Sequence, residues 1–321
     1  MAVYTEVSDE ELIAFISNYD IGDLLSFKGI AEGVENSNYM LHTNKGVYIL
    51  TLYEKRVNPD DLPFFLGLMD HLADKGISCP VPIKQNSGET LGVLANRPAV
   101  IVSFLEGMWI KRPSSQHCAA LGSAVARLHL ATADFNIGRP NALSLNDWRP
   151  LFEQSRNRAD EINAGLEAEI LTELGTLEAN WPDDLPAGII HADLFPDNVF
   201  FLEGKLSGLI DFYFACNDFW AYDLAICLNA WCYEPDFAFN VTKARALLNG
   251  YRRIRPLSAA EFEALPLLAR GASLRFLLTR LHDWLRVPDG ALVKPKDPME
   301  YLKKLRFHQS VTNSTDYGLL P

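Results

Sequence analysis

The stretch from residue 190 to residue 211 constrains the fold of this chain more than any other. It reads IHADLFPDN, continues as VFFL, turns at EGK and, after LSG, ends as LID. A glycine-bearing turn between two apolar runs predicts a β-hairpin directly after the loop. Asp193, Asn198 and Asp211 would then be held at neighbouring ends of loops and strands.

The order and chemistry of these three side chains are similar to those of kinase catalytic loops. In that pattern the first Asp meets the acceptor hydroxyl, the Asn binds a metal ion, and the later Asp contacts metal and phosphate. A bare His-x-Asp occurs by chance in many chains. His-x-Asp-x4-Asn followed by a hairpin and Ile-Asp-Phe is much more specific. The stretch therefore predicts phosphoryl transfer, against the alternative that these are ordinary capping and turn residues.

Length and composition indicate a globular protein with two lobes. A chain of 321 residues exceeds one hydrophobic core, and 48% hydrophobic with 22% charged residues is typical of folded domains. The net charge of -12 argues against a nucleic-acid partner, which would need a basic surface. We expect no membrane partner, because no apolar run reaches ~18 residues. Five cysteines without a CxxC pair predict reduced thiols and a cytoplasmic location.

The pattern over residues 1–106 predicts a small, mostly antiparallel sheet with a helix packed on it. The sequence SDEE at residues 8–11 is a capping-box motif before apolar residues at helical spacing, which predicts a short opening helix. Strands are expected at 24–30, 39–43, 47–53, 91–94 and 99–104, and a helix over 60–75. We interpret this region as the nucleotide-binding lobe.

Two segments of this lobe are candidates for nucleotide binding. The loop from Gly29 to Asn38 is rich in Gly and small polar residues, and such a loop can fold its backbone N–H groups over phosphates. Taken alone, a glycine-bearing turn between strands more often has no ligand, and no Walker A motif occurs. The candidate phosphate-binding residues are Gly33, Asn36, Ser37 and Asn38. Ser103 and Leu105 lie in a segment that resembles a hinge, whose exposed backbone could bond an adenine edge.

Residues 107–321 are predicted to form a larger, mainly helical lobe that carries the catalytic hairpin. Helices are expected from Ser114 or Ser115 through Leu128, over 150–180, from Asp223 onward, over 241–252 and over 259–288. Residues 141–148 are predicted to be a polar loop, and the tail from residue 310 to be frayed. His117 and His129 are interpreted as helix-surface or satisfied core groups.

These residues resemble the aminoglycoside-phosphotransferase and choline-kinase-like superfamily, a branch of the protein-kinase-like fold. The resemblance covers most of the chain, and the HxDxxxxN motif of the superfamily matches His191, Asp193 and Asn198. It implies an α+β fold of two lobes, Asp193 as the catalytic residue, and ATP and Mg2+ as cofactors. It also implies that Asn198 and Asp211 are the metal ligands. His191 and Asp223 would support the catalytic loop.

Within that superfamily the chain most resembles the homoserine kinase branch. Three segments carry this resemblance: YILTLYE at 48–54, DWRP at 147–150 and ASLRFLLTRL at 272–281. The resemblance implies phosphorylation of the side-chain hydroxyl of L-homoserine, a step of threonine biosynthesis. An amino-acid carboxylate is best held by an arginine fork, so one arginine should lie within reach of Asp193. The candidate substrate-binding residues are Arg275, Arg280, Arg149 and Trp148. For each arginine, the alternative is a surface ion pair.

One position departs from the superfamily pattern. The superfamily sets a Lys or Arg on the third strand and pairs it with a Glu on the next helix, whereas this chain has Thr51 and no Glu over 60–75. Lys28, Lys55 and Arg56 are nearby candidates for the missing cation. The departure motivates the hypothesis of a nucleotide-binding pseudokinase, although the intact catalytic residues argue against it. A kinase of choline, ethanolamine, methylthioribose or aminoglycosides would also be compatible with the catalytic motif.

Overall fold

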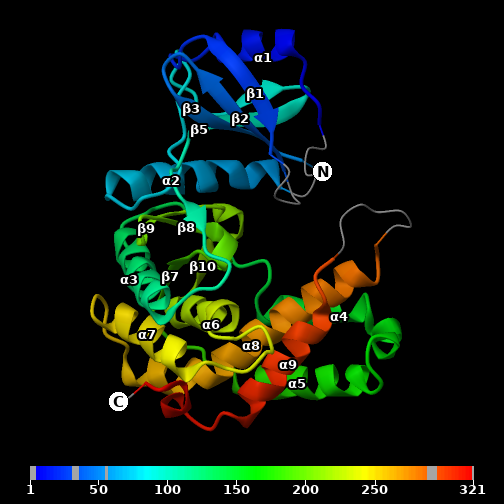
Figure 1. The fold of residues 1–321 in the computed structure, drawn as a ribbon. Coiled ribbons are helices and arrows are strands. Elements are labelled where there is room, and N and C mark those ends of the chain that lie inside the picture. Colours follow the sequence, from blue (N-terminus) through cyan, green and yellow to red (C-terminus); the bar gives the residue numbers. More distant parts are fainter. Residues whose placement is uncertain (1–4, 31–35, 55–56, 288–294, 320–321) are drawn as a thin grey trace. The chain divides into compact units, whose positions relative to one another are not determined.

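The computed structural model describes residues 5–30, 36–54, 57–287 and 295–319 (Figure 1). The chain divides into two compact units, here called the first and second lobes. The first lobe comprises Met1–Gly107, Phe135–Ile137 and Ser207–Tyr213; the second comprises Met108–Asp134, Gly138–Leu206 and Phe214–Pro321. The boundary expected at residue 106 lies close to Gly107. The two short later segments of the first lobe were not foreseen.

The first lobe is built on an antiparallel five-stranded sheet. Its strands are β1 (Leu24–Gly29), β2 (Ser37–Thr43), β3 (Val47–Leu52), β4 (Gly92–Leu94) and β5 (Arg97–Ser103), in the order β1-β2-β3-β5-β4. Buried residues alternate with half-buried ones along β2, so one face of this strand supplies the core. The predicted hairpin of β2 and β3 is confirmed, and its register places Thr51 opposite Asn38.

The helices of the first lobe are α1 (Asp9–Ile16) and α2 (Leu62–Asp74), the latter preceded by the 3-10 turn η1 (Pro59–Asp61). Ser8 and Glu11 form the expected capping box at the start of α1. Leu12, Phe15 and Ile16 of this helix join the apolar face of the sheet in one buried cluster. Burying each such side chain contributes about 1.5–3 kcal/mol, which fixes α1 on the sheet.

The second lobe is mainly helical. Its helices are α3 (Ser115–Ala131), α4 (Leu145–Glu153), α5 (Leu166–Asn180), α6 (Trp220–Trp231), α7 (Val241–Arg252), α8 (Ala259–Trp284) and α9 (Pro298–Ser310). Glycines permit a close crossing of α3 and α7. A Cβ on Gly122 would lie 2.0 Å from the Leu247 carbonyl oxygen, and one on Gly250 would lie 2.2 Å from that of Ala119. The long helix α8 packs against both α6 and α9 (Figure 1).

Short strands of this region frame the catalytic loop. β7 (Ala187–Ile190) pairs antiparallel with β10 (Cys216–Phe219), and β6 (Met108–Trp109) pairs with β8 (Val199–Leu202). β8 and β9 (Lys205–Leu209) are the two strands of the predicted hairpin, in the sheet order β6-β8-β9. The turn between them uses Glu203 and Gly204, with φ of 50° and 76°. The remaining short 3-10 turns are η2 (Arg156–Glu161), η3 (Pro196–Asn198), η4 (Phe212–Phe214) and η5 (Ser314–Tyr317).

Several expectations for the helices were wrong in position. The polar loop expected over 141–148 ends early, because Ser144 and Asp147 form a capping box that starts α4 at Leu145. The single helix expected over 150–180 is divided into the end of α4, the turn η2 and α5. Gly165, with φ of 81°, stands at the start of α5. The helix expected from Asp223 begins at Trp220, and α9 was not predicted.

The tail is not frayed as far as the structure describes it. Ser314 to Tyr317 form η5, and the side chains of Ser314, Tyr317 and Leu319 are buried. Tyr317 shares a hydrogen bond of 2.7 Å with Nδ1 of His308. Buried apolar and hydrogen-bonded groups therefore hold this segment on the second lobe. Along the described parts of the chain, no helix has the length and apolar character needed to cross a bilayer.

Candidate active site

The catalytic loop joins β7 to β8 in the second lobe and fixes Asp193 through Asn198. The Asn198 amide nitrogen donates to the Asp193 carbonyl oxygen at 2.8 Å and to the Asp193 carboxylate at 3.1 Å. The backbone N–H of Phe195 donates to the same carbonyl at 2.8 Å. These bonds commit the Asn198 amide nitrogen, so its amide oxygen is the atom through which it could ligate a cation.

The residue before Asp193 has an uncommon backbone conformation. Ala192 has a φ of 62°, in the left-handed region that costs a non-glycine residue roughly 1–2 kcal/mol. Two buried charged side chains hold it there. Its N–H donates to Asp223 Oδ1 at 2.9 Å, and its carbonyl oxygen accepts from Arg275 at 2.6 Å. Charge-assisted bonds of this kind are about twice as strong as neutral ones, so they offset the local strain.

Asp223 fixes the conformation of this loop through its hydrogen bonds, and we call it the brace. Its carboxylate is fully buried and also accepts the His191 N–H at 3.0 Å and His129 Nε2 at 3.1 Å. Burial disfavours the charge, but the bonds from His129 and His191 outweigh burial and hold the pKa of Asp223 below its ordinary value. Asp223 is therefore ionised at neutral pH and can accept all of these hydrogen bonds.

His129 continues the brace into the core. Burial lowers the pKa of His129, although Asp223 opposes the shift, so the imidazole is neutral at pH 7. A neutral ring that donates from Nε2 accepts at Nδ1, where the Tyr251 hydroxyl lies at 2.9 Å. Arg255 donates to that hydroxyl at 3.2 Å and forms a bidentate ion pair with Glu261. His129 thus belongs to a buried network from α3 to α7 and α8, and is not a metal ligand.

Of the three arginine candidates, only Arg275 is bonded to the catalytic loop. It is 1% exposed, and its guanidinium lies over the rings of Phe276 and Phe214 as well as bonding Ala192. Arg280 forms an ion pair with Glu300 on α9. These contacts place Arg275 beside the loop and engage Arg280 in holding α8 to α9.

The other two substrate candidates lie on α4. Arg149 forms a bidentate ion pair with Glu178 on the surface, in which both side chains are partly exposed. For Arg149, the structure therefore agrees with the alternative to substrate binding, which was a surface ion pair. Trp148 is fully buried, and its indole Nε1 donates to the Leu143 carbonyl at 2.7 Å.

Asp211 belongs to the first lobe, together with the position of the missing cation. It has a φ of 64° and directly precedes η4. Thr51 is buried on β3 and donates its hydroxyl to the Asn38 side chain at 2.8 Å. The hydroxyls of Tyr213 and Tyr53 lie 3.4 Å apart, and burial raises the pKa of Tyr213 to about 12. The hydroxyl of Thr51 is thus bonded to a neutral amide, and no cation takes part in this hydrogen bond.

The expected phosphate loop is only partly described. Gly33, Lys55 and Arg56 lie outside the described residues, and Lys28 is exposed on β1. Ser37 and Asn38 lie on β2, and Asn36 precedes it. The Asn36 side chain accepts the Glu54 N–H at 3.2 Å, and the Ser37 hydroxyl donates to the Glu54 carboxylate at 2.7 Å. These side chains are engaged within the lobe, so any contact with a nucleotide would come from their backbone.

The expected hinge lies at the end of β5. Ser103 is the last paired residue of that strand, and its hydroxyl accepts the Val81 N–H at 2.9 Å. Leu105 lies beyond the paired residues and packs against Gly208, where a Cβ would lie 2.6 Å from the leucine side chain. The segment after Ser103 therefore leaves the sheet, as expected of a hinge.

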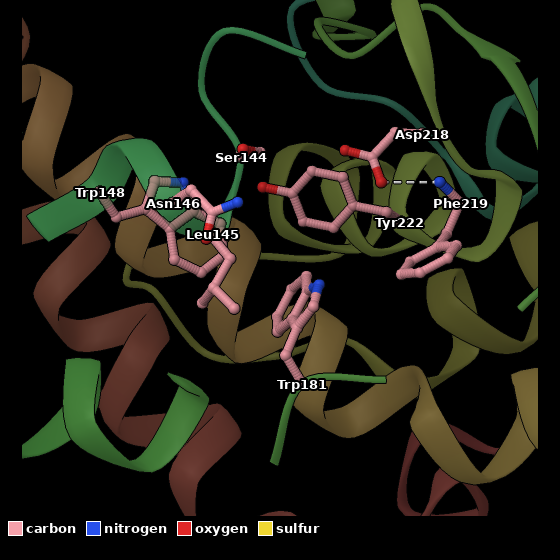
Figure 2. Close-up of a pocket in the computed structure, with 8 residues that line it drawn as sticks. All are labelled: Ser144, Leu145, Asn146, Trp148, Trp181, Asp218, Phe219 and Tyr222. Carbon is pink, nitrogen blue, oxygen red and sulfur yellow. Dashed lines mark hydrogen bonds between the residues drawn. The ribbon is translucent and has the colours of Figure 1, made fainter. Parts of the chain in front are cut away.

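A pocket of about 230 Å3 opens in the second lobe (Figure 2). Its lining residues are Ser144, Leu145, Asn146, Trp148, Trp181, Asp218, Phe219 and Tyr222. Asp218 and Tyr222 face it from β10 and α6, and the two tryptophans form its aromatic side (Figure 2). Of the candidates named from the sequence, only Trp148 lines this pocket.

His129 is a satisfied core group, one of the two interpretations made from the sequence, whereas the sequence assigned no role to Tyr251 or Asp218. His129 meets Asp223 across 94 positions of sequence and Tyr251 across 122. Such a contact has no local signal.

Comparison with known proteins gives consistent matches over the whole chain. The model of the "Phosphotransferase enzyme family" matches residues 26–257. The homoserine kinase of Rhizobium meliloti is 63% identical, and the alignment covers 99% of this chain and 98% of that protein. The homoserine kinase of Nitrobacter winogradskyi is 67% identical, again over 99% of this chain and 98% of that protein.

A solved structure shares the fold at low sequence identity. The amicoumacin kinase hAmiN, in complex with AMP-PNP and Ca2+, superposes with a TM-score of 0.68 at 17% identity, over 94% of this chain and 92% of that one. This likeness confirms the kinase-like α+β fold expected from the catalytic loop. The family model and the full-length relatives show that the chain belongs to the phosphotransferase enzyme family.

Proposed function

We propose that this protein transfers the γ-phosphoryl group of ATP to the side-chain hydroxyl of L-homoserine, giving O-phospho-L-homoserine. The observation that carries the proposal is the identity of 63–67% with homoserine kinases over 99% of the chain. The hydrogen bonds of the catalytic loop support it, because they hold a carboxylate where phosphoryl transfer requires one.

Asp193 is the proposed catalytic residue. Phosphoryl transfer passes through a loose transition state, so the protein mainly positions groups and balances charge. The Asp193 carboxylate would accept a hydrogen bond from the acceptor hydroxyl, orient its oxygen toward the phosphorus, and take the proton late. The Asn198 amide donates to one carboxylate oxygen of Asp193 at 3.1 Å, which helps to fix the orientation of this side chain.

Asn198 and Asp211 are the proposed ligands of Mg2+. An amide oxygen and a carboxylate suit this ion, which prefers oxygen ligands and is commonly held by few protein groups plus substrate phosphates. The amide nitrogen of Asn198 donates to Asp193, so the amide oxygen is the atom available to a metal ion. When bound, Mg2+ would neutralise charge on the ATP phosphates. Thr51 supplies no positive charge. The metal ion and the backbone N–H groups near residues 36–38 would therefore balance more of the negative charge of the phosphates.

Arg275 is the proposed contact for the acceptor carboxylate. It is bonded to the catalytic loop, and its Nε makes no hydrogen bond within the described residues. A guanidinium has five N–H donors, so the bond to Ala192 leaves donors available. Arg280 and Arg149 are not proposed for this role, because ion pairs with Glu300 and Glu178 occupy them.

Identification of the product tests the proposal. Purified protein would be incubated with MgATP and L-homoserine, and the products followed by 31P NMR. We expect a phosphomonoester signal that coincides with added O-phospho-L-homoserine and grows with ADP. ATP consumption without a phosphomonoester would contradict the proposal. EDTA should abolish the signal and excess Mg2+ should restore it.

A further inference from the structure

The pocket beside Trp148 contains a carboxylate that the catalytic role does not use. Asp218 lies on β10, and its oxygens accept the Asn141 amide at 2.6 Å and the Phe219 N–H at 2.7 Å (Figure 2). Among the described residues it forms no ion pair with a basic side chain. The Asp218 side chain is half-buried, and burial raises its pKa; the hydrogen bonds from Asn141 and Phe219 and the charge of Arg275 oppose this shift only in part. The pocket wall therefore presents a negative group whose charge is incompletely compensated.

Tyr222 adds a second incompletely satisfied group. Its side chain is 1% exposed, and its hydroxyl makes no hydrogen bond within the described residues. Figure 2 shows this hydroxyl pointing toward Ser144 and Asn146 at the pocket. Buried hydroxyls normally have a partner; Arg275 interacts with this one without a hydrogen bond of full geometry, so the hydroxyl retains capacity for a polar ligand. Asp218 and Tyr222 are two polar groups of the same pocket wall, and both interact with Arg275.

The shape and lining of the pocket limit that ligand. At about 230 Å3 the pocket is small, and it suits a ligand of the size of a small amino acid better than a large one. The rings of Trp148 and Trp181 meet edge to face at 5.1 Å and form an aromatic side. Aromatic faces attract cations, and a desolvated carboxylate attracts them more strongly. A primary ammonium group satisfies both features.

The pocket is connected to the catalytic loop through Arg275. That side chain lies beside Tyr222, whose pKa it lowers against the larger raising effect of burial, and it bonds the Ala192 carbonyl. Tyr222 directly precedes the brace Asp223. In the pairing of β7 with β10, Asp218 stands opposite Gly188, on the strand that leads into Asp193. A ligand in the pocket would thus affect the position of the catalytic loop through Arg275 and β10.

We infer that this pocket binds the α-ammonium end of a small amino acid, with Asp218 as the counter-ion. If the proposed function holds, the acceptor L-homoserine is one source of this ammonium. A second amino-acid molecule that acts as an effector is the other. Both present the same chemistry to Asp218, and Tyr222 would accept or donate one further hydrogen bond.

Calorimetric binding of three ligands tests the inference. L-homoserine has the ammonium and the hydroxyl, L-2-aminobutyrate keeps the ammonium but cannot be phosphorylated, and 4-hydroxybutyrate lacks the ammonium. In Asp218→Asn we expect about tenfold or greater loss of affinity for both ammonium ligands and little change for 4-hydroxybutyrate. Asp184→Asn, an exposed carboxylate of the same lobe, is the matched control and should bind like wild type.

The outcomes separate the two sources and remain decisive if the acceptor is another molecule. One L-homoserine site per chain, weakened in Asp218→Asn, identifies the pocket as the acceptor site, whereas two L-homoserine sites of which only one is weakened identify an effector site. The binding assay needs no turnover, so failure of the proposed function does not affect it. Unchanged affinity in Asp218→Asn, or no binding of either ammonium ligand to wild type, would overturn the inference. If Asp218→Asn does not fold, Tyr222→Phe decides: unchanged affinity overturns it, and a loss supports it.

Discussion

The catalytic loop and strand β3 differ in the kind of side chains that hold them. Charged groups hold the loop, whereas neutral groups bond one another around Thr51 of β3. Around Ala192 and Asp223, buried ions hold the backbone: Asp223 accepts three hydrogen bonds, and Arg275 clamps the carbonyl of Ala192. Around Thr51, where the superfamily has a cation, neutral groups bond one another: the Thr51 hydroxyl donates to Asn38. Within the described residues, charged side chains fix the backbone of the loop, whereas a neutral hydroxyl and amide stand at the strand position where the superfamily has a cation.

This difference bears on the catalytic role that we propose for the loop. Positioning a single carboxylate is the main demand of phosphoryl transfer, and the loop meets it with a strained residue held by charge-assisted bonds. Balancing phosphate charge can be distributed over a metal ion and backbone N–H groups. Loss of the strand cation is therefore compatible with an active enzyme, whereas loss of the loop geometry is not.

The variant Asp193→Asn tests most directly whether the loop, and not the region of Thr51, is essential for catalysis. The amide cannot accept the acceptor proton, so we expect kcat to fall by about 10²- to 10⁴-fold while ATP binding persists. Asp197→Asn changes an exposed carboxylate of the same loop and should keep kcat within about twofold of wild type. Steady-state ADP release checks both variants. Wild-type kcat in Asp193→Asn would remove the loop from the chemistry.

Asp223→Ala tests the brace itself. The change leaves the buried N–H groups of His191 and Ala192 and the ring of His129 without their acceptor. We expect a loss of about 3 kcal/mol or more in the free energy of unfolding, together with reduced kcat in the folded fraction. Urea denaturation measures the former. Full stability and full activity would show that the loop holds its conformation unaided.

Acid should destabilise the second lobe through its buried histidines. Burial lowers the pKa of His308 to about 3, while an unfolded histidine titrates near 6.5. Between these values the unfolded state binds more protons, so the stabilisation is complete above about pH 6.5 and is lost progressively below it. The expected slope is up to about 1.4 kcal/mol per pH unit for this residue. His308→Gln should flatten the pH dependence of unfolding between about pH 6 and 4. An unchanged slope would contradict the assignment.

Thr51→Val should have the smallest effect. It removes the hydrogen bond to Asn38, which is worth about 1 kcal/mol of stability, and leaves the side-chain shape almost unchanged. We expect kcat and the KM for ATP to stay within about threefold of wild type. A loss comparable with that of Asp193→Asn would mean that Thr51 itself contacts the nucleotide, and the contrast between the two regions would disappear.

The sequence predicted well what depends on local pattern. The strands of the first lobe, the start of α1 and the catalytic hairpin follow from alternation, capping residues and turn residues close together in the chain. The errors have local causes as well. The capping box of Ser144 and Asp147 was not recognised, so the start of α4 was predicted to be loop. Tertiary contacts override composition in the polar tail, where Tyr317 is buried.

The site was predictable only where its residues share a motif. The HxDxxxxN pattern leads directly to Asp193 and Asn198. No local pattern could show that Arg275 bonds Ala192 across 83 positions while Arg280 pairs with Glu300. The same limit applies to Asp218, because a cavity is a property of packed elements and not of neighbouring residues in the chain.

The measurement that tests the account most directly is the ratio of kcat to KM across a panel of acceptors with MgATP. The panel contains L-homoserine, D-homoserine, L-serine, choline, ethanolamine, methylthioribose and kanamycin. Turnover with L-homoserine should exceed that with every other acceptor by about 100-fold or more, since binding polar groups of a substrate discriminates strongly. Preferential turnover of choline or kanamycin, or ATP binding with no acceptor turned over, would contradict the account.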